Sequence, residues 1–452
     1  MIPSPLAPWP LVAWLACGGA GSDEPSDADI GPPELSVAAA TPMVPVLTWD
    51  AEAGAVSVVD LDDGRSWVTD QGKPSDGVAV FGLKAGHRYE LAPDGAPKHS
   101  VDFEAPDVPA SLSYASAAEV VPGGSALGDG GVMMSIAAEF DAFVAVMDRD
   151  GDWTWWTEAD AGLTAASARV TLDGAGVLFA QHERERVEDL SIATRLSWDG
   201  RERVDVRTPT GHHMAAELPD GSLAFLGHRV ESHALDGDEY DVLSDTIVVV
   251  DGDGRDQVLF DFFATGAPYV PCTHGVAATD KFGWTDVREW THSNSLIHDA
   301  DTGRFYLMAR HLDALLAIDE ASGEVAWQLG GRDATRAFAE AGQAFDHGHT
   351  SWVNDTDAWI FDNRVHAELP SRLVHYDLST DPVEVLWTFE ETEGRNITFL
   401  GDVQPAPDGH VLGAWTVPGD VTEHDESGRE VWRARLGPGA VLGRIRYVEL
   451  PR

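Results

Sequence analysis

The chain has 452 residues, of which 43% are hydrophobic, and it contains 45 glycines and 26 prolines. That mixture is typical of many short strands joined by turns, and it argues against a chain that is mostly disordered. Its 76 acidic and 30 basic residues give a formal net charge of −46, and a surface of that charge repels nucleic acid and anionic lipid, so we expect neither as a partner.

The first 17 residues resemble the signal of a bacterial lipoprotein. An apolar run at 11–16 ends at Cys17, which two glycines follow, and in such signals the cysteine becomes the lipidated N-terminus. No Lys or Arg precedes the run, and Trp14 stands where a Leu is usual. We expect an exported protein, periplasmic or on the cell surface, anchored through Cys17. The only other cysteine is Cys272, so no disulfide framework is expected.

Residues 18–34 are rich in Asp, Pro and Gly, which predicts a flexible tether. Residues 35–108 carry alternating apolar runs, for example at 44–49 and 55–59, which turn-forming sequences separate. This pattern predicts a small β-sandwich of the fibronectin or immunoglobulin kind that spaces or docks a larger domain. A Pro-Asp-Val-Pro sequence at 106–109 marks the boundary.

From residue 110 to residue 452 one pattern recurs: a strand ends in an Asp-x-x-Gly or similar turn, and a strand rich in Trp or Phe follows. The turns lie at 148–151, 197–200, 251–254, 319–323, 376–378 and 425–428. Six repeats of roughly 45 to 55 residues, with about four short strands each, predict a six-bladed β-propeller whose aromatic residues pack between blades. The expected fold is therefore all-β, a six-bladed β-propeller preceded by a small β-sandwich. A double-sheet sandwich is the rival, but it does not require so regular a period.

Three histidines fall where the first strand of a blade is expected to begin, the part of a blade that lines the central channel. They are His213, His292 and His349. In equivalent positions of successive blades they would converge at the channel mouth, whereas exposed loop histidines are the alternative. Arg310 ends an apolar strand and is suited to present its guanidinium group to a buried anion. Pairing of Arg310 with one of the many carboxylates is the other interpretation.

The central repeats carry short motifs in a fixed order. They are the pair His292 and Asn294, Arg310, an Ile-Asp…Gly…Trp-Gln-Leu-Gly-Gly segment at 318–331, His349, and Phe-Asp-Asn at 361–363. This order resembles the signature of the bacterial arylsulfotransferases. The pair His212-His213 with Leu-Pro-Asp-Gly at 218–221, and the turn at 403–409, are similar to further parts of that family. The resemblance runs from about residue 110 to the C-terminus.

The resemblance implies transfer of a sulfuryl group from an aryl sulfate to a phenol, without a nucleotide donor. It implies a ping-pong mechanism in which His349 attacks sulfur and becomes a sulfohistidine, and the neutral imidazole is a competent nucleophile for that step. His292, Arg310 and His213 would then bind the sulfate oxygens or protonate the leaving phenolate. Further substrate contacts are expected from Asn294, His212, His347 and Asn363. No cofactor and no bound metal are expected.

The chain departs from the family pattern at three positions. Gly348 replaces a Gln, and because His347 lies two residues before His349, either histidine is a candidate nucleophile. Met214 replaces an acidic residue after the histidine pair, and Arg364 replaces a Gly after Phe-Asp-Asn. If Arg364 points into the channel, the choice of acceptor would differ.

Two other functions remain open from the sequence. The first is an exported propeller that binds a partner or acts as a scaffold, which predicts a histidine cluster that is splayed or filled by side chains. The second is a metal-dependent propeller hydrolase, which requires channel carboxylates around a divalent ion. The acidic runs at 148–152 and 251–256 resemble calcium loops but lack the distal Glu, and turns are the simpler interpretation.

Overall fold

The computed structural model describes residues 31–451, apart from 114, 122–126, 129, 139–140, 184–188, 236, 276–278, 282–283, 418 and 438. The expected signal, its Cys17 and most of the expected tether therefore lie outside the described residues. The described helices are short: α1 (Ala110–Ser113), η1 (Pro97–His99), η2 (Phe262–Thr265), η3 (Arg310–Leu312), η4 (Ala341–Gln343) and η5 (Pro407–Gly409). None of them is long and apolar enough to cross a membrane.

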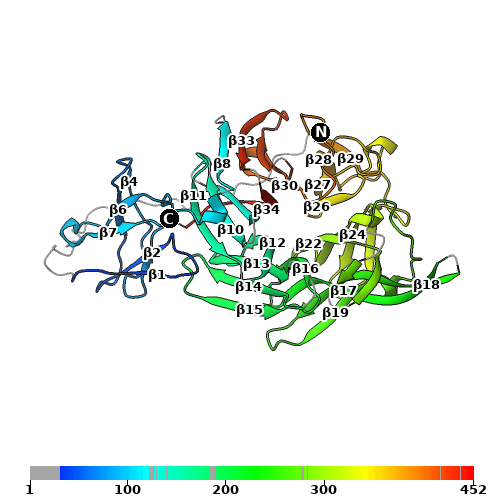
Figure 1. Cartoon of the computed structure of the whole chain (residues 1–452), viewed down its shortest axis with the longest axis horizontal. Coiled ribbons are helices and arrows are strands. Elements are labelled where there is room, and N and C mark those ends of the chain that lie inside the picture. The colour runs from blue at the N-terminus through cyan, green and yellow to red at the C-terminus, as the bar shows by residue number, and fades with distance from the viewer. Residues whose placement is uncertain are drawn as a thin grey trace, which may run out of the picture.

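The N-terminal part forms two small sheets at one end of the molecule, drawn in blue in Figure 1. One sheet contains β1 (Glu34–Val37), β2 (Pro45–Thr48) and β5 (Val78–Ala79). The other has the order β4 (Ser66–Val68), β3 (Val56–Asp60), β6 (Arg88–Pro93) and β7 (Val101–Glu104). Alternate residues of β3, Val56 and Val58, are fully buried while Val59 is exposed, as expected of strands with one face on a core.

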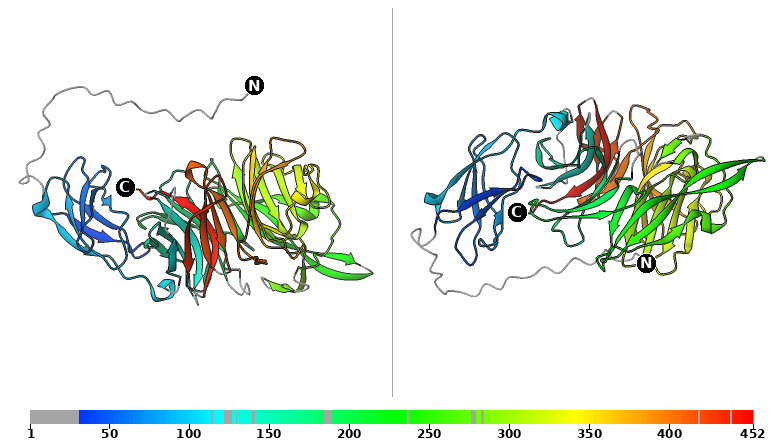
Figure 2. Two further views of the ribbon diagram at one scale, coloured as in Figure 1. Left: turned by 90° about the horizontal axis from the view of Figure 1, so that it is seen from above. Right: turned by 60° about the horizontal axis from the view of Figure 1, so that its bottom comes forward.

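Six further sheets follow one another along the chain (Figures 1 and 2). The first joins β9 (Gly131–Ala138), β10 (Asp141–Asp148) and β11 (Trp153–Glu158) to β34 (Ala440–Val448). The second contains β12 (Leu163–Val170), β13 (Gly176–Glu183), β14 (Ile192–Ser197) and β15 (Arg203–Arg207). The third contains β16 (His212–Glu217), β17 (Leu223–Leu235), β18 (Asp238–Val250) and β19 (Asp256–Asp261), extended by β20 (Thr279–Lys281) and β21 (Trp284–Glu289).

The remaining three sheets complete the series. The fourth contains β22 (Ser293–Asp299), β23 (Arg304–Ala309), β24 (Ala314–Asp319) and β25 (Val325–Gly330). The fifth contains β26 (Gly348–Val353), β27 (Asp357–Asp362), β28 (Arg372–Asp377) and β29 (Glu384–Glu390). The sixth contains β30 (Asp402–Pro405), β31 (Val411–Trp415), β32 (Asp420–His424) and β33 (Glu430–Leu436), with β8 (Ala117–Val121) on its outer edge.

The innermost strands close a ring. In order, β34, β12, β16, β22, β26 and β30 each contact the next, and β30 contacts β34 again. The last strand of the chain, β34, completes the first sheet by pairing antiparallel with β9, Tyr447 opposite Val132. This closure removes the free inner edge that an open ring would leave. The all-β propeller preceded by a small β-sandwich that the sequence predicts is confirmed.

The six predicted turns all join the third strand of a sheet to its fourth, for example β10 to β11 and β32 to β33. Their aspartates accept hydrogen bonds from backbone amides within the turn. Asp148 Oδ1 accepts from the amides of Asp150 and Asp152, both at 2.9 Å, and Asp251 Oδ1 accepts from those of Asp253 and Arg255. The acidic runs considered as calcium loops are therefore hairpin turns closed by their own side chains.

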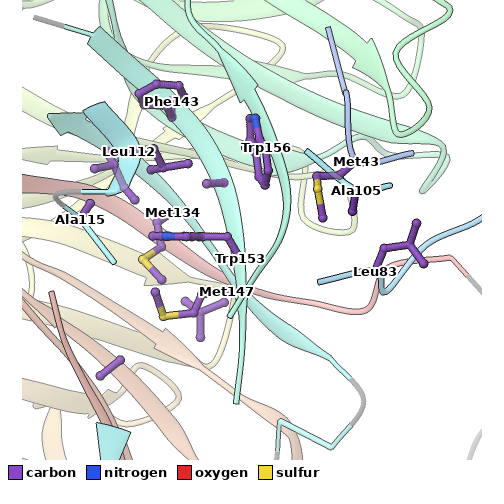
Figure 3. Packing of buried hydrophobic residues seen from close by; sticks show 14 of the residues in the cluster. Met43, Leu83, Ala105, Leu112, Ala115, Met134, Phe143, Met147, Trp153 and Trp156 are labelled. Carbon is purple, nitrogen blue, oxygen red and sulfur yellow. The ribbon is translucent and has the colours of Figure 1, made fainter. Parts of the chain in front are cut away.

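Aromatic residues of β11 contact both the second sheet and the N-terminal sandwich. Trp155 donates its indole hydrogen to the carbonyl of Trp198 in the second sheet (2.9 Å) and meets that ring edge-on. Trp153 and Trp156 share one buried cluster with Met43 and Leu83 of the N-terminal sandwich, as Figure 3 shows. The sandwich is thus docked on the propeller through apolar contacts, each buried large side chain contributing about 1.5–3 kcal/mol.

Candidate active site

The chain has the same local geometry at the start of three successive inner strands. The ladders of β16, β22 and β26 each contain a bulge at their start, between His212 and Ala215, Ser293 and Ser295, and Gly348 and Ser351. Beside each bulge one histidine adopts a left-handed backbone, with φ of 52° at His213, 47° at His292 and 54° at His347. Such a conformation costs roughly 1–3 kcal/mol for a non-glycine residue, and bulges re-aim side chains. The repetition indicates that the fold holds these imidazoles in place at an energetic cost.

The imidazole rings form a continuous row across the three sheets. Ring centroids lie 5.6 Å apart between His213 and His292, 4.6 Å between His292 and His311, and 5.4 Å between His311 and His347. His366 extends the row, 4.4 Å from His347. Glu289 Oε2 orients His292 through its Nδ1 (2.8 Å). Burial lowers the pKa of His311 to about 3 and that of His347 to about 2, so both rings are neutral at neutral pH.

His349 lies in β26 and is almost fully buried, 4% exposed. Its Nδ1–H donates to the carbonyl oxygen of Gly401 (3.1 Å), and because a carbonyl can only accept, Nε2 is left with its lone pair. Burial holds the pKa of His349 well below its usual value, and the positive charges of Arg444 and Arg310 lower it further. The ring is therefore a neutral imidazole with one defined tautomer.

The side-chain amide of Asn294 is buried without a hydrogen-bond partner in the described part of the chain. It is 0% exposed, and among the described residues neither its Oδ1 nor its Nδ2 has a hydrogen-bond partner. A buried amide without partners costs about 1–3 kcal/mol. The Nε of Arg310 is likewise buried and unpaired within the described chain, while its Nη2 donates to the carbonyl of Thr398 (2.6 Å). Unsatisfied donors and acceptors in one region indicate a site built for a polar ligand.

Three arginines that the sequence analysis did not single out lie on inner strands across the channel: Arg169 on β12, and Arg444 and Arg446 on β34. Burial lowers the pKa of Arg169 to about 9 and that of Arg444 to about 10. Asp402 pairs with Arg446 (3.1 Å), whereas its nearest approach to Arg444 is 4.0 Å. Both terminal nitrogens of Arg444 are buried without a hydrogen-bond partner in the described part of the chain. Inside a strongly acidic protein, this region of the channel carries an excess of positive charge.

Behind the histidine row lies a carboxylate–imidazole chain. Asp245 contacts His212 Nε2 at 3.3 Å and His228 Nδ1 at 3.1 Å, and His212 Nδ1 lies 2.7 Å from His213 Nδ1. Burial alone would raise the pKa of Asp245, but the hydrogen bonds from His212 and His228 hold it well below its usual value. The carboxylate stays charged, and it can stabilise a proton passing through His212 to His213.

The structure brings His213, His292 and His347 into one row, and it holds His349 and Arg310 against carbonyls of one loop, those of Gly401 and Thr398. Asn363, in contrast, contacts the loop at 397–401. Its Nδ2 donates to the carbonyls of Ile397 (2.6 Å) and Leu400 (3.1 Å), so it holds the loop whose Thr398 and Gly401 carbonyls bind Arg310 and His349.

The three departures from the family pattern have local reasons. Arg364 donates to Glu390 (2.5 Å) and to the carbonyl of Pro370 (3.2 Å), so its charge is directed to β29. Met214 is a buried core residue. At Gly348 a Cβ would lie 3.1 Å from Met308 Sδ and 3.2 Å from Ile360 Cγ2, which is tighter than a side chain tolerates without a shift of its neighbours.

A cavity of about 660 Å³ adjoins the row of rings. Phe262, Trp290, Leu312 and Leu316 line much of it, and His311 and His366 form part of its wall. A mostly apolar cavity with a few polar groups is the usual form of a small-molecule site, and this volume accommodates an aromatic ring. Neither His311 nor His366 is among the site residues predicted from the sequence, although His311 directly follows Arg310.

The sequence matches the family model described as arylsulfotransferase over residues 128–427. No curated protein matches it. Among solved structures it is similar to TolB from Acinetobacter baumannii, at 13% identity over 81% of this chain and 80% of that chain, with a TM-score of 0.44. It is also similar to a catalytically inactive virginiamycin B lyase from Staphylococcus aureus, at 11% identity over 74% of this chain and 99% of that chain, with a TM-score of 0.39. Likeness at this level has no bearing on the activity of the chain.

Proposed function

Because the chain belongs to the arylsulfotransferase family, we propose that it moves a sulfuryl group from an aryl sulfate to a phenol through a sulfohistidine at His349, without a nucleotide donor. One observation carries the proposal. A buried imidazole, neutral and with the lone pair on Nε2, is held by the Gly401 carbonyl, and the charges of the buried Arg310 and Arg444 act on it and lower its pKa. A nucleophile and a binding site for an anion are thereby combined.

In the first half-reaction the lone pair of His349 Nε2 forms a bond to sulfur while the bond from sulfur to the aryl oxygen breaks. Arg310, Arg444 and the amide of Asn294 bind the sulfuryl oxygens, whose charge changes during the transfer. The ring of His349 becomes cationic as it gives up its lone pair. The hydrogen bond from its Nδ1–H to the Gly401 carbonyl then strengthens, because the donor is charged.

The leaving aryl oxygen takes a proton from the protonated form of His213, whose positive charge the chain through His212 to the Asp245 carboxylate stabilises. In the second half-reaction the acceptor phenol gives its proton back to His213, and its oxygen takes the sulfuryl group from Nε2. The aromatic rings of donor and acceptor bind in turn in the apolar cavity next to His311. Exclusion of water there favours transfer to a phenol over hydrolysis.

The first experiment uses the full-length chain with Cys17→Ser and 4-nitrophenyl sulfate as donor. We expect nitrophenolate release that depends on an added phenol, and its loss in His349→Ala. Intact-protein mass spectrometry after donor alone should show one added sulfuryl group in the wild type. Release that persists in His349→Ala would move the nucleophile to His347 or His292, and no release with several phenols would favour a binding module.

We also propose that the protein works outside the cytoplasm, lipid-anchored through Cys17. The apolar run before Cys17 and the glycines after it support this. Cell fractionation of the wild type and Cys17→Ser tests it. The wild type should be found with membranes and the variant in the soluble exported fraction, and an identical distribution of the two would contradict the anchor.

A further inference from the structure

A cysteine and two histidines from three distant segments meet beside the apolar cavity. Cys272 Sγ lies 3.0 Å from His347 Nε2 and 3.4 Å from His366 Nε2, and the three atoms all lie within 4.8 Å of one another. Cys272 belongs to the segment after η2, His347 precedes β26, and His366 follows β27. The mechanism above uses neither Cys272 nor His366.

The distances fit a common metal ion at their centre. With Zn–S of about 2.3 Å and Zn–N of about 2.0–2.1 Å, a tetrahedral site places sulfur and nitrogen about 3.5 Å apart. The observed separations of 3.0 and 3.4 Å need only small shifts to reach that value. One thiolate and two imidazoles are ligands for zinc, whereas calcium and magnesium prefer oxygen.

Carboxylates orient the histidine that is more exposed. His366 Nδ1 lies 2.9 Å from Asp346 Oδ1 and 3.3 Å from Asp313 Oδ2, so its Nε2 is turned towards Cys272. The other oxygen of Asp313 accepts the backbone amide of His347 (2.7 Å). A carboxylate behind a ligating histidine is the usual outer shell of a zinc site.

We propose that Cys272, His347 and His366 bind one Zn²⁺ ion, with the fourth position open towards the cavity that Cys272 and His366 line. This departs from the expectation, drawn from the sequence, that no metal is bound. The thiolate and the carboxylates of Asp313 and Asp346 supply the negative charge that balances the ion. The three ligands do not include the sulfuryl-transfer residues His349, Arg444 and Asn294, and the proposal does not depend on that activity.

The direct test is titration of the metal-stripped, full-length Cys17→Ser protein with Co²⁺. We expect one equivalent to bind with a thiolate-to-cobalt charge-transfer band, and Zn²⁺ to displace it. Cys272→Ser should abolish the band, and Asp346→Asn should weaken binding by about 10- to 100-fold. His311→Asn is the matched control, because it removes a ligand from the alternative cluster of Glu289, His292 and His311 and should leave the band intact.

A second measurement needs no substitution in the site. In the Cys17→Ser protein Cys272 is the only cysteine, so its alkylation by iodoacetamide reports on its sulfur alone. One equivalent of Zn²⁺ should slow alkylation about tenfold or more. Alkylation that Zn²⁺ leaves unchanged, or cobalt binding that survives Cys272→Ser but not His311→Asn, would overturn the proposal. Neither the cobalt titration nor the alkylation uses an aryl sulfate. A failure of the zinc proposal is therefore distinguishable from a failure of sulfuryl transfer.

Discussion

His349 and Gly401 are joined by a hydrogen bond of 3.1 Å from the imidazole Nδ1–H to the backbone carbonyl. This single contact selects the tautomer of a buried ring and leaves Nε2 with its lone pair. The carbonyl belongs to a loop that Asn363 holds through the carbonyls of Ile397 and Leu400. The state of the imidazole is therefore set by a backbone segment from the boundary between the fifth and sixth sheets.

Arg444 is expected to be as important to the reaction as Arg310. The two terminal nitrogens of its buried guanidinium group have no hydrogen-bond partner among the described residues and are suited to bind the sulfuryl oxygens, so Arg444→Met should lower kcat/KM for 4-nitrophenyl sulfate by about 100-fold. Arg433→Met is the matched control, because Arg433 is paired with Asp420 and Glu430 on β33. Rates within threefold of each other in the wild type and Arg444→Met would contradict this role.

Asn294 and Asn363 should respond oppositely to the same substitution. Asn294→Leu removes a buried amide without partners among the described residues, so the free energy of unfolding should stay equal or rise while activity falls. Asn363→Leu removes two hydrogen bonds to the loop and should lower the free energy of unfolding by about 1–3 kcal/mol. Chemical denaturation measures both. Loss of stability in Asn294→Leu would show that its amide has a structural partner.

His213 should matter most for poor leaving groups. A general acid assists in proportion to the basicity of the oxygen that departs, and such assistance is typically worth about 10²–10⁴-fold. In His213→Ala, transfer from phenyl sulfate should fall at least about tenfold more than transfer from 4-nitrophenyl sulfate. Rates measured over a series of substituted phenyl sulfates give the comparison. An equal loss for all donors would assign His213 to binding the sulfate instead of protonating the phenolate.

His424 gives the fold a defined loss of stability in acid. It is buried against Phe389, its Nε2 lies 2.9 Å from Thr422 Oγ1, and its Nδ1 has no partner among the described residues. Burial lowers its pKa from 6.5 to about 4. Below pH 6.5 the unfolded chain takes up a proton that the folded chain refuses until about pH 4, so stability falls across this window.

The contribution of His424 is about 2 kcal/mol at pH 5 relative to pH 8. His424→Gln, which keeps a group able to bond Thr422, should lose that much less stability over the same range. Urea denaturation at pH 8 and pH 5 for both proteins measures the difference. Parallel losses in the two proteins would mean that His424 does not titrate in this way.

Local patterns in the sequence were sufficient to predict the all-β propeller architecture. The turns at 148–151 and 425–428 and the aromatic strands after them are short-range signals, and each proved to be the hairpin between the third and fourth strands of a sheet. Short-range signals also predicted that His213, His292 and His349 lie in equivalent positions where inner strands begin. His213 and His349 lie in β16 and β26 and His292 directly precedes β22, but the histidine that shares the left-handed backbone of His213 and His292 is His347. Turn chemistry and alternation act over a few residues, so a single segment carries them.

Contacts between distant segments could be identified only in the folded chain. Arg444 reaches the channel because β34, the last strand of the chain, pairs with β9 from the beginning of the propeller sequence. Cys272 meets His347 and His366 across 75 and 94 residues. Alternation shows which side chains share a face of a strand, but not which face lines a channel or which loop covers it. Ring closure and packing settle that, because they act between segments whose separation in the sequence carries no signal.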